Sequence, residues 1–96
     1  MPRARWTDAG LLDVERLYGF LCDHNANAAA AAAESIFAGT EQLALFPESG
    51  RAAAGRPSDE RELLIPFGAS GYVVLYRVIE DGVLILAVRH MREHGY

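Results

Sequence analysis

The chain has 96 residues, of which 51% are hydrophobic, and its thirteen acidic and nine basic residues give a net charge of -4. This length suits one domain with a modest core, and the apolar content is that of a folded chain. All the basic residues are arginine. Because binding nucleic acid through charge requires a basic excess, the acidic balance argues against direct nucleic-acid binding by this chain alone.

Membrane, secreted and metal-binding classes are not expected. No apolar run approaches the ~20 residues of a membrane span, and residues 1–10 lack the apolar core of a secretion signal. Cys22 is alone, so it cannot form an internal disulfide, and we expect it to be a buried helix residue. His24 and His94 have no second ligand at metal spacing. We therefore expect one cytoplasmic domain, residues 1–96, with no metal or cofactor.

The first part of the chain predicts a strand and a helix. Residues 3–6 are expected to form a short edge strand, and Thr7 or Asp8 can cap the helix that follows. Gly10 and Gly19 would each weaken that helix by about 1 kcal/mol relative to alanine if they are interior. Apolar residues recur at helical spacing and predict one buried stripe, made of Leu11, Val14, Leu17, Tyr18 and Leu21.

A second helix is expected after residues 23–27, where Asn25 or Asn27 can cap it. Six consecutive alanines, residues 28–33, favour a helix and allow a neighbouring helix to approach closely. The two helices therefore predict a helical hairpin. Residues 46–60 have two prolines, two glycines and no periodicity, so a loop is predicted there.

Three runs rich in β-branched and aromatic residues follow and predict strands at 62–68, 72–79 and 83–90. Asp81-Gly82 predicts a hairpin with a type I′ turn, and Pro66 predicts an edge or a bulge. Both faces of the last two runs are apolar, so the sheet is either covered on both sides or binds a partner. The order β-α-α-β-β-β predicts an α+β fold of two layers, with the helical hairpin packed on an antiparallel sheet of three or four strands.

The helical hairpin, the Pro47, Gly50 and Arg51 loop and the segment RELLIPFGASGYVVLYRVIEDGVLILAVRHMRE resemble the RelE/ParE superfamily of bacterial toxins from type II toxin–antitoxin modules. The resemblance spans nearly the whole chain. It implies a cognate antitoxin whose C-terminal segment wraps the toxin in a hetero-oligomer. ParE-like members inhibit DNA gyrase and RelE-like members cut messenger RNA on the ribosome, so the resemblance leaves two activities open.

Cutting RNA would require a general base, a general acid and cations near the phosphate. The absence of lysine, the net negative charge and the apolar middle strand argue against docking on a ribosome. We therefore favour the ParE-like function, with no catalytic residue and with Arg89, His90 and Arg92 as contacts to gyrase. Taken alone, residues 87–96 could equally be a strand with a solvated end. The candidates for a ribonuclease site would be Arg61, Arg89, His90, Arg92 and Tyr96.

A ParD-like antitoxin is expected to cover apolar surface left by the fold, by placing a helix in a groove. Leu11, Tyr18 and Tyr76 are the expected apolar contacts. The arginines around the loop are suited to bidentate capture of an acidic antitoxin segment, and these are Arg51, Arg56 and Arg61. An adaptor without toxicity is a further alternative, which growth arrest on expression and a neighbouring partner gene would distinguish.

Overall fold

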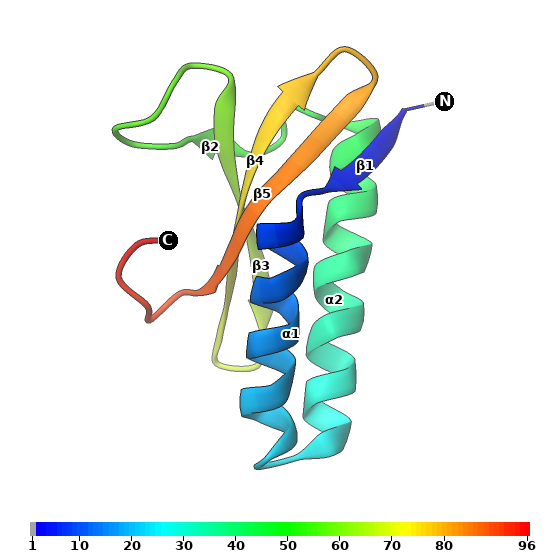
Figure 1. The fold of residues 1–96 in the computed structure, drawn as a ribbon, viewed down its shortest axis with the longest axis vertical. Coiled ribbons are helices and arrows are strands. Elements are labelled where there is room, and N and C mark those ends of the chain that lie inside the picture. The colour runs from blue at the N-terminus through cyan, green and yellow to red at the C-terminus, as the bar shows by residue number, and fades with distance from the viewer. Residues whose placement is uncertain (1) are drawn as a thin grey trace.

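The computed structural model describes residues 2–96, which form two helices and a five-stranded sheet (Figure 1). The predicted helical hairpin and the final strands are confirmed. A two-residue strand lies inside the segment predicted to be a loop. In chain order the elements are β1 Arg3–Trp6, α1 Asp8–Cys22, α2 Ala26–Leu45, β2 Arg51–Ala52, β3 Glu60–Phe67, β4 Ser70–Ile79 and β5 Gly82–His90.

The sheet has the strand order β1-β5-β4-β3-β2 and is mixed. The prediction of an antiparallel sheet holds for β2 to β5, but β1 is parallel to β5. The Arg3 N–H donates to the Asp81 carbonyl over 3.1 Å, and the Thr7 N–H donates to the Ile85 carbonyl over 3.1 Å. Because β1 pairs with the last strand and not with a neighbour in sequence, no turn motif could reveal its partner or direction.

The start of α1 is tied to β5. The Thr7 hydroxyl accepts a hydrogen bond from the Gly10 N–H and donates one to the Ile85 carbonyl, over 3.0 and 2.8 Å. Thr7 is therefore the N-cap, one of the two candidates. A Cβ on Gly10 would lie 3.1 Å from the Ile85 carbonyl oxygen, whereas one on Gly19 would meet nothing within 4 Å. Gly10 thus serves the close packing of α1 on β5, and Gly19 does not.

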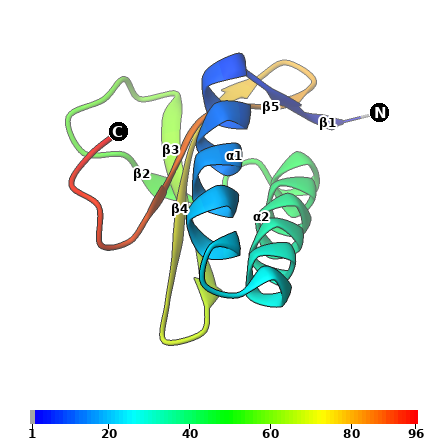
Figure 2. The ribbon, with the colours of Figure 1, turned by 60° about the horizontal axis from the view of Figure 1, so that its bottom comes forward.

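Both helices cover one face of the sheet, and the core lies between the layers (Figure 2). Asn25 caps α2 by accepting a hydrogen bond from the Ala28 N–H. Ala29 and Ala32 are buried, as expected for small residues between helices, whereas Cys22 is exposed, so its expected burial is wrong. In the described part of the chain, neither helix combines the length and apolarity that a membrane crossing demands. The core side chains that are at most 1% exposed are Ile36, Leu43, Val74, Tyr76, Val83, Ile85 and Val88.

The second face of the sheet is also covered. Figure 2 shows the C-terminal segment and the loop before β3 on the side of the sheet away from the helices. Val73 and Leu75 alternate with core residues of β4, and each is only 1% exposed. Of the two alternatives for the apolar second face, the structure therefore has the sheet covered on both sides.

The hairpin between β4 and β5 is confirmed, but its turn is not the predicted one. Ile79 pairs with Gly82, so Glu80 and Asp81 are the two loop residues. Among the described residues only glycines have positive φ, which excludes a type I′ turn centred on Asp81 and Gly82. Gly82 has φ 128°, and a Cβ there would collide with the backbone of Arg3. This glycine is therefore explained by the close approach of β1.

A bulge in β5 determines which face of the sheet each side chain at the end of that strand lies on. Leu75 pairs with Ala87 while Tyr76 pairs with Ile85, so Leu86 is the extra residue. An extra residue reverses the alternation of side chains beyond it. Val88 accordingly returns to the core, together with Val83 and Ile85 from before the bulge.

Candidate functional site

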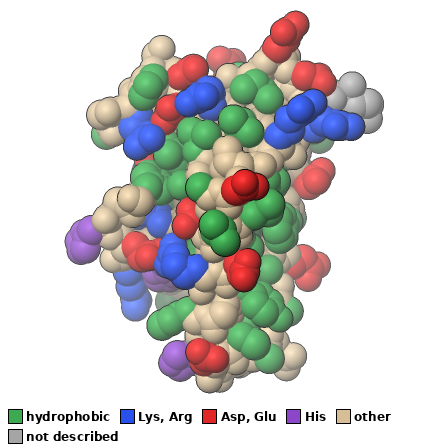
Figure 3. Space-filling view, viewed as in Figure 1, with side chains coloured by type: hydrophobic (Ala, Val, Ile, Leu, Met, Phe, Trp, Pro, Cys, Tyr) green, Lys and Arg blue, Asp and Glu red, His purple; other side chains and the backbone are tan. Residues whose placement is uncertain are grey.

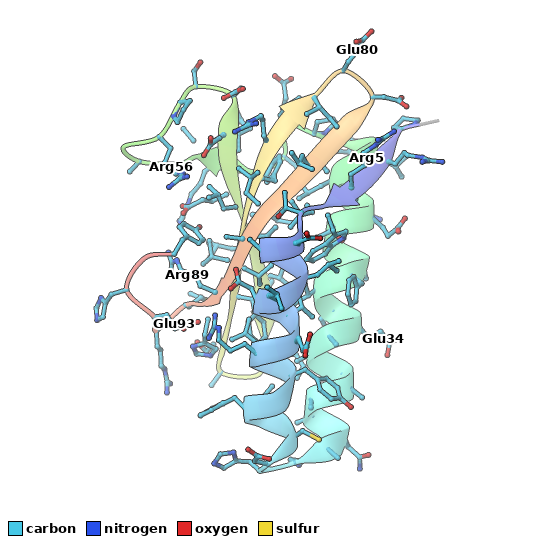
Figure 4. All side chains as sticks on the ribbon, viewed as in Figure 1. Arg5, Glu34, Arg56, Glu80, Arg89 and Glu93 are labelled. Atoms are coloured by element: carbon cyan, nitrogen blue, oxygen red, sulfur yellow. The ribbon has the colours of Figure 1, made fainter. Side chains whose placement is uncertain are left out.

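The face of the sheet away from the helices carries four of the candidate residues, Arg51, Arg56, Arg89 and Tyr96, and Figure 4 labels Arg56 and Arg89. Beside the C-terminal segment, arginine and acidic side chains are intermixed rather than gathered into one basic surface (Figure 3). We call this surface the charged face. It consists of Arg51, Arg56, Glu60, Glu62, Arg77, Arg89 and Tyr96.

Glu60 is the central acid of the charged face and is only 5% exposed. Its carboxylate accepts hydrogen bonds from Arg56 Nε over 2.6 Å and from Arg77 Nη2 over 3.3 Å. The hydrogen bond from Arg56 lowers the pKa of Glu60, and the same bond raises the pKa of Arg56. Both guanidinium groups are therefore paired with a carboxylate of the same face.

Glu62 is the second acid of the charged face and contacts Arg51 and Tyr96. Its carboxylate lies 3.3 Å from Arg51 Nε and accepts a hydrogen bond from the Tyr96 hydroxyl over 2.5 Å. The Tyr96 ring centroid lies 5.2 Å from the Arg89 guanidinium carbon and 6.0 Å from that of Arg56. Burial and the hydrogen bond to Glu62 raise the pKa of Tyr96. This phenol thus stays protonated and acts as a donor, not as a base.

Two of the expected antitoxin contacts serve the fold. Arg61 donates from Nε and Nη2 to the Gly50 carbonyl over 3.0 and 2.8 Å, which fixes the loop after α2. Tyr76 is fully buried, and its hydroxyl donates to the Pro47 carbonyl over 2.6 Å and accepts from the Gly50 N–H. The expectation that Tyr76 contacts an antitoxin is therefore wrong, because its side chain has no exposed surface.

Arg89 and His90 face opposite sides of the sheet, as neighbours on a strand do. Arg89 belongs to the charged face, where Nη1 donates to the Glu93 carbonyl over 3.1 Å. Its Nε is buried and has no hydrogen-bond partner among residues 2–96. His90 lies on the helix side, with its ring edge against Tyr72 at 5.5 Å between centroids, and its Nδ1 accepts from the Arg92 N–H. These target-contact candidates thus form two groups.

A cavity of about 500 Å³ lies between α1 and the end of the sheet. Its walls are mainly apolar and aromatic, and its charged side chains include Arg16 and Arg92. No carboxylate of the described residues pairs with the Arg92 side chain. We call it the α1 cavity. It is lined by Arg16, Leu17, Phe20, Leu21, Phe67, Tyr72, His90, Arg92 and Glu93.

Glu93 attaches the C-terminal segment to α1. Arg16 donates to its carboxylate from both terminal nitrogens, over 2.9 and 3.3 Å, and the His90 N–H donates to it over 2.8 Å. Burial alone would raise the pKa of Glu93, but these hydrogen bonds outweigh it and lower the pKa. The end of the chain is therefore held in place, and the arginine that pairs with Glu93 comes from α1.

The outer side of α1 offers apolar surface that the core does not use. Leu11 and Tyr18 are 46% and 42% exposed, so they are available to a partner although the stripe predicted them to be buried. Sequence reasoning missed Phe20 and Phe67 of the α1 cavity. Phe20 is 67% exposed. The sequence feature that could have identified it is an aromatic residue that lies outside the apolar stripe of α1.

The five residues of the possible ribonuclease site are not brought together. Arg61 holds the loop after α2, Arg89 and Tyr96 lie on the charged face, and the other two line the α1 cavity, namely His90 and Arg92. Within residues 2–96, no group of three or more His, Cys, Asp and Glu side chains is arranged to hold a metal ion. The five residues are therefore divided among the loop after α2, the charged face and the α1 cavity.

Residues 4–95 match the family model of the ParE toxin of the type II toxin–antitoxin system parDE. The chain is 38% identical over 92 residues to "Toxin RelE3" of Caulobacter vibrioides, covering 96% of this chain and 90% of that relative. It is 32% identical over 78 residues to "Toxin RelE1" of the same organism, covering 81% of each. The fold matches the solved structure "Chromosomal ParDE TA system from P. aeruginosa" with a TM-score of 0.74 at 18% identity, over 94% and 96% of the two chains. This chain belongs to the ParE toxin family of type II toxin–antitoxin systems, within the RelE/ParE superfamily.

Proposed function

We propose that this toxin inhibits DNA gyrase by binding it and is neutralised by a ParD-like antitoxin. One observation carries the proposal: three of the four arginines of the charged face are turned toward carboxylates of the same face. Arg56 and Arg77 bind Glu60, and Arg51 binds Glu62. An RNA phosphate would have to displace these carboxylates and would meet their charge. A binding protein has no such requirement.

The division of the candidate residues supports the same proposal. General acid–base chemistry needs a donor and an acceptor within about 3 Å of one reacting group. His90 faces the α1 cavity, whereas Arg89 and Tyr96 lie on the other side of the sheet. The three residues expected as contacts to gyrase, Arg89, His90 and Arg92, are accordingly proposed as contacts to a protein partner and not as catalysts. The two that line the α1 cavity, His90 and Arg92, are proposed to contact the antitoxin. Since gyrase acts on chromosomal DNA, the proposed site of action is the cytoplasm.

Cleavage of messenger RNA on the ribosome is the second candidate function. It is favoured by the similarity to two proteins named as RelE toxins. It is also favoured by the Tyr96 hydroxyl and the Arg89 guanidinium on one surface, because a protonated phenol beside a cation could act as a general acid. On this surface Arg89 has no carboxylate partner among residues 2–96, whereas Arg51 and Arg56 each pair with one.

The antitoxin is proposed to cover the α1 cavity and the exposed apolar residues of α1. An acidic segment with large apolar side chains would fill the cavity between Phe20 and Phe67 and pair with Arg92. Leu11 and Tyr18 extend this apolar surface along the outer side of the helix. Arg51 and Arg56 remain alternative contacts, at the cost of giving up their bonds to Glu62 and Glu60.

Expression in growing cells tests the proposal. The toxin alone should stop growth and produce double-strand DNA breaks while messenger RNA stays intact, and co-expression of the antitoxin should restore growth. Growth arrest with cut messenger RNA and intact DNA would replace gyrase inhibition by the second candidate function. The matched control is a chain with Tyr96→Phe, which removes the phenol but keeps the ring; under the gyrase proposal it should remain toxic.

A further inference from the structure

A groove at the end of the molecule opposite the turn between the helices is not used by any part of the proposed function. Figure 1 places the C-terminal end of α2 and the β4–β5 hairpin together at that end. The groove between them has a volume of about 410 Å³. We call it the hairpin groove. Its lining includes Leu45, Pro47, Glu48, Val78, Ile79, Glu80 and Asp81.

The hairpin groove adjoins the most exposed apolar residues of α2 and its end. Leu45 lines it and is 62% exposed, and Phe46, the next residue, is 61% exposed. Their neighbour Leu43 is completely buried, so the helix contributes to the core up to its last turn and then presents apolar side chains outward. Single exposed apolar residues are ordinary, but two adjoining an apolar groove are typical of an interface.

The rim of the hairpin groove is acidic. Glu48, Glu80 and Asp81 surround it, and their carboxylates make no hydrogen bond or ion pair within residues 2–96. Glu80 stands at the tip of the hairpin and points away from the fold (Figure 4). Arg3 pairs with Gly82 in the sheet, and the hydrogen bond that joins it to Asp81 is between backbone groups. An apolar floor with an acidic rim suits a segment that carries apolar and basic side chains.

We propose that the hairpin groove is the surface through which this toxin binds its target, by taking up a basic and apolar segment of DNA gyrase. The inference rests on the proposed function and assigns the binding of gyrase to one surface of the toxin. The charges around the α1 cavity and the hairpin groove determine which partner each of them can bind. Arg92 makes the α1 cavity suitable for an acidic segment, whereas Glu48 and Glu80 would repel that segment from the hairpin groove. Target and antitoxin therefore bind at opposite ends of the toxin.

Two substitutions with matched controls test the inference. Leu45→Ser removes apolar surface from the groove, and Leu12→Ser is its control because Leu12 is equally exposed, at 62%, on α1. Glu80→Arg reverses a charge on the rim, and Glu34→Arg makes the same change in the middle of α2. For each variant, one measures the toxin concentration that gives half-maximal cleavage of DNA by gyrase and the Kd for the antitoxin.

Leu45→Ser and Glu80→Arg should each raise the toxin concentration for half-maximal cleavage about tenfold, as the loss of an interface hot spot does. The antitoxin Kd should not change in either groove variant, and both controls should act like the parent in the gyrase assay. Full gyrase activity in both groove variants would overturn the inference while leaving the proposed function intact. A weaker antitoxin complex in these variants would overturn it as well, by assigning the groove to the antitoxin. A parent toxin that causes no cleavage would overturn both.

Discussion

The carboxylate of Asp13 in α1 accepts a hydrogen bond of 2.8 Å from the backbone N–H of Val88 in β5. This N–H lies beyond the end of β1, whose last residue, Trp6, pairs with Ile85, and the bulge at Leu86 turns His90 toward the helices. Asp13 thus stabilises the register that places His90, and not Arg89, on the helix side of the sheet. One side chain of a helix therefore helps to decide which candidate residues share a surface.

Replacing Asp13 by alanine should lower the free energy of unfolding by about 1–3 kcal/mol, because the N–H of the buried Val88 would lose its partner. Asp13→Asn is the control, since the amide oxygen can accept the same hydrogen bond. Urea denaturation of the three proteins measures the difference. Equal stability of Asp13→Ala and the parent would show that the bulge does not depend on this contact.

The two glycines of α1 should respond to alanine in opposite directions. Gly19→Ala should stabilise the protein by up to about 1 kcal/mol, because alanine favours the helix and a Cβ there meets nothing. Gly10→Ala should be destabilising, because its Cβ would press on the Ile85 carbonyl and the Trp6 ring. Thermal unfolding of both variants measures this, and a stabilising Gly10→Ala would contradict the close packing of α1 on β5.

Stability should fall in acid through Glu60. Its pKa is lowered in the folded protein from an ordinary value of 4.5, so the unfolded chain binds the proton more readily. The stabilisation is therefore fully present above pH 4.5 and is lost as the pH falls through the folded pKa. Glu60→Gln should lower the Tm at pH 7, and this difference should shrink below pH 4.5.

Glu34→Gln is the control for this titration, since Glu34 is an exposed residue of α2 that forms no ion pair with any of residues 2–96. Its Tm should follow that of the parent protein at every pH. A constant Tm difference for Glu60→Gln from pH 7 to pH 3 would mean that its carboxylate charge does not contribute to folding.

The antitoxin should depend more on Arg92 than on Arg51. Arg92→Glu places an acid at the α1 cavity and should weaken an acidic antitoxin segment about tenfold or more. Arg51→Glu changes a residue whose guanidinium already faces Glu62, and it should have a smaller effect on the Kd. Titration calorimetry at two salt concentrations measures both. A larger effect on the Kd from Arg51→Glu than from Arg92→Glu would mean that the antitoxin's carboxylates bind the arginines of the charged face.

Much of the fold could be predicted because its signals are local. The caps at Thr7 and Asn25, the alanine run and the hairpin into β5 each depend on a few adjacent residues. The pairing of β1 with β5 could not be predicted, because it joins the two ends of the chain. Burial of Glu60 also has no sequence signal, since it depends on two arginines from different elements.

The candidate site was predicted in its residue types but not in its grouping. The residues at the end of β5 and just after it, Arg89, His90 and Arg92, were expected as contacts to gyrase. The alternation of side chains separates Arg89 from the other two, and the C-terminal segment returns over the sheet to place Tyr96 against Glu62. A return of this kind depends on Glu93 meeting Arg16 of α1, a pairing across most of the chain.

Gyrase activity with purified components tests the central claim most directly. Supercoiled plasmid, gyrase, ATP and the toxin are incubated, and detergent then traps any cleaved complex. Linear DNA that rises with toxin concentration and disappears when antitoxin is added is the predicted result. Supercoiled DNA that stays uncut, together with messenger RNA cut by the same preparation in a translating extract, would contradict the claim and make the charged face a ribonuclease site.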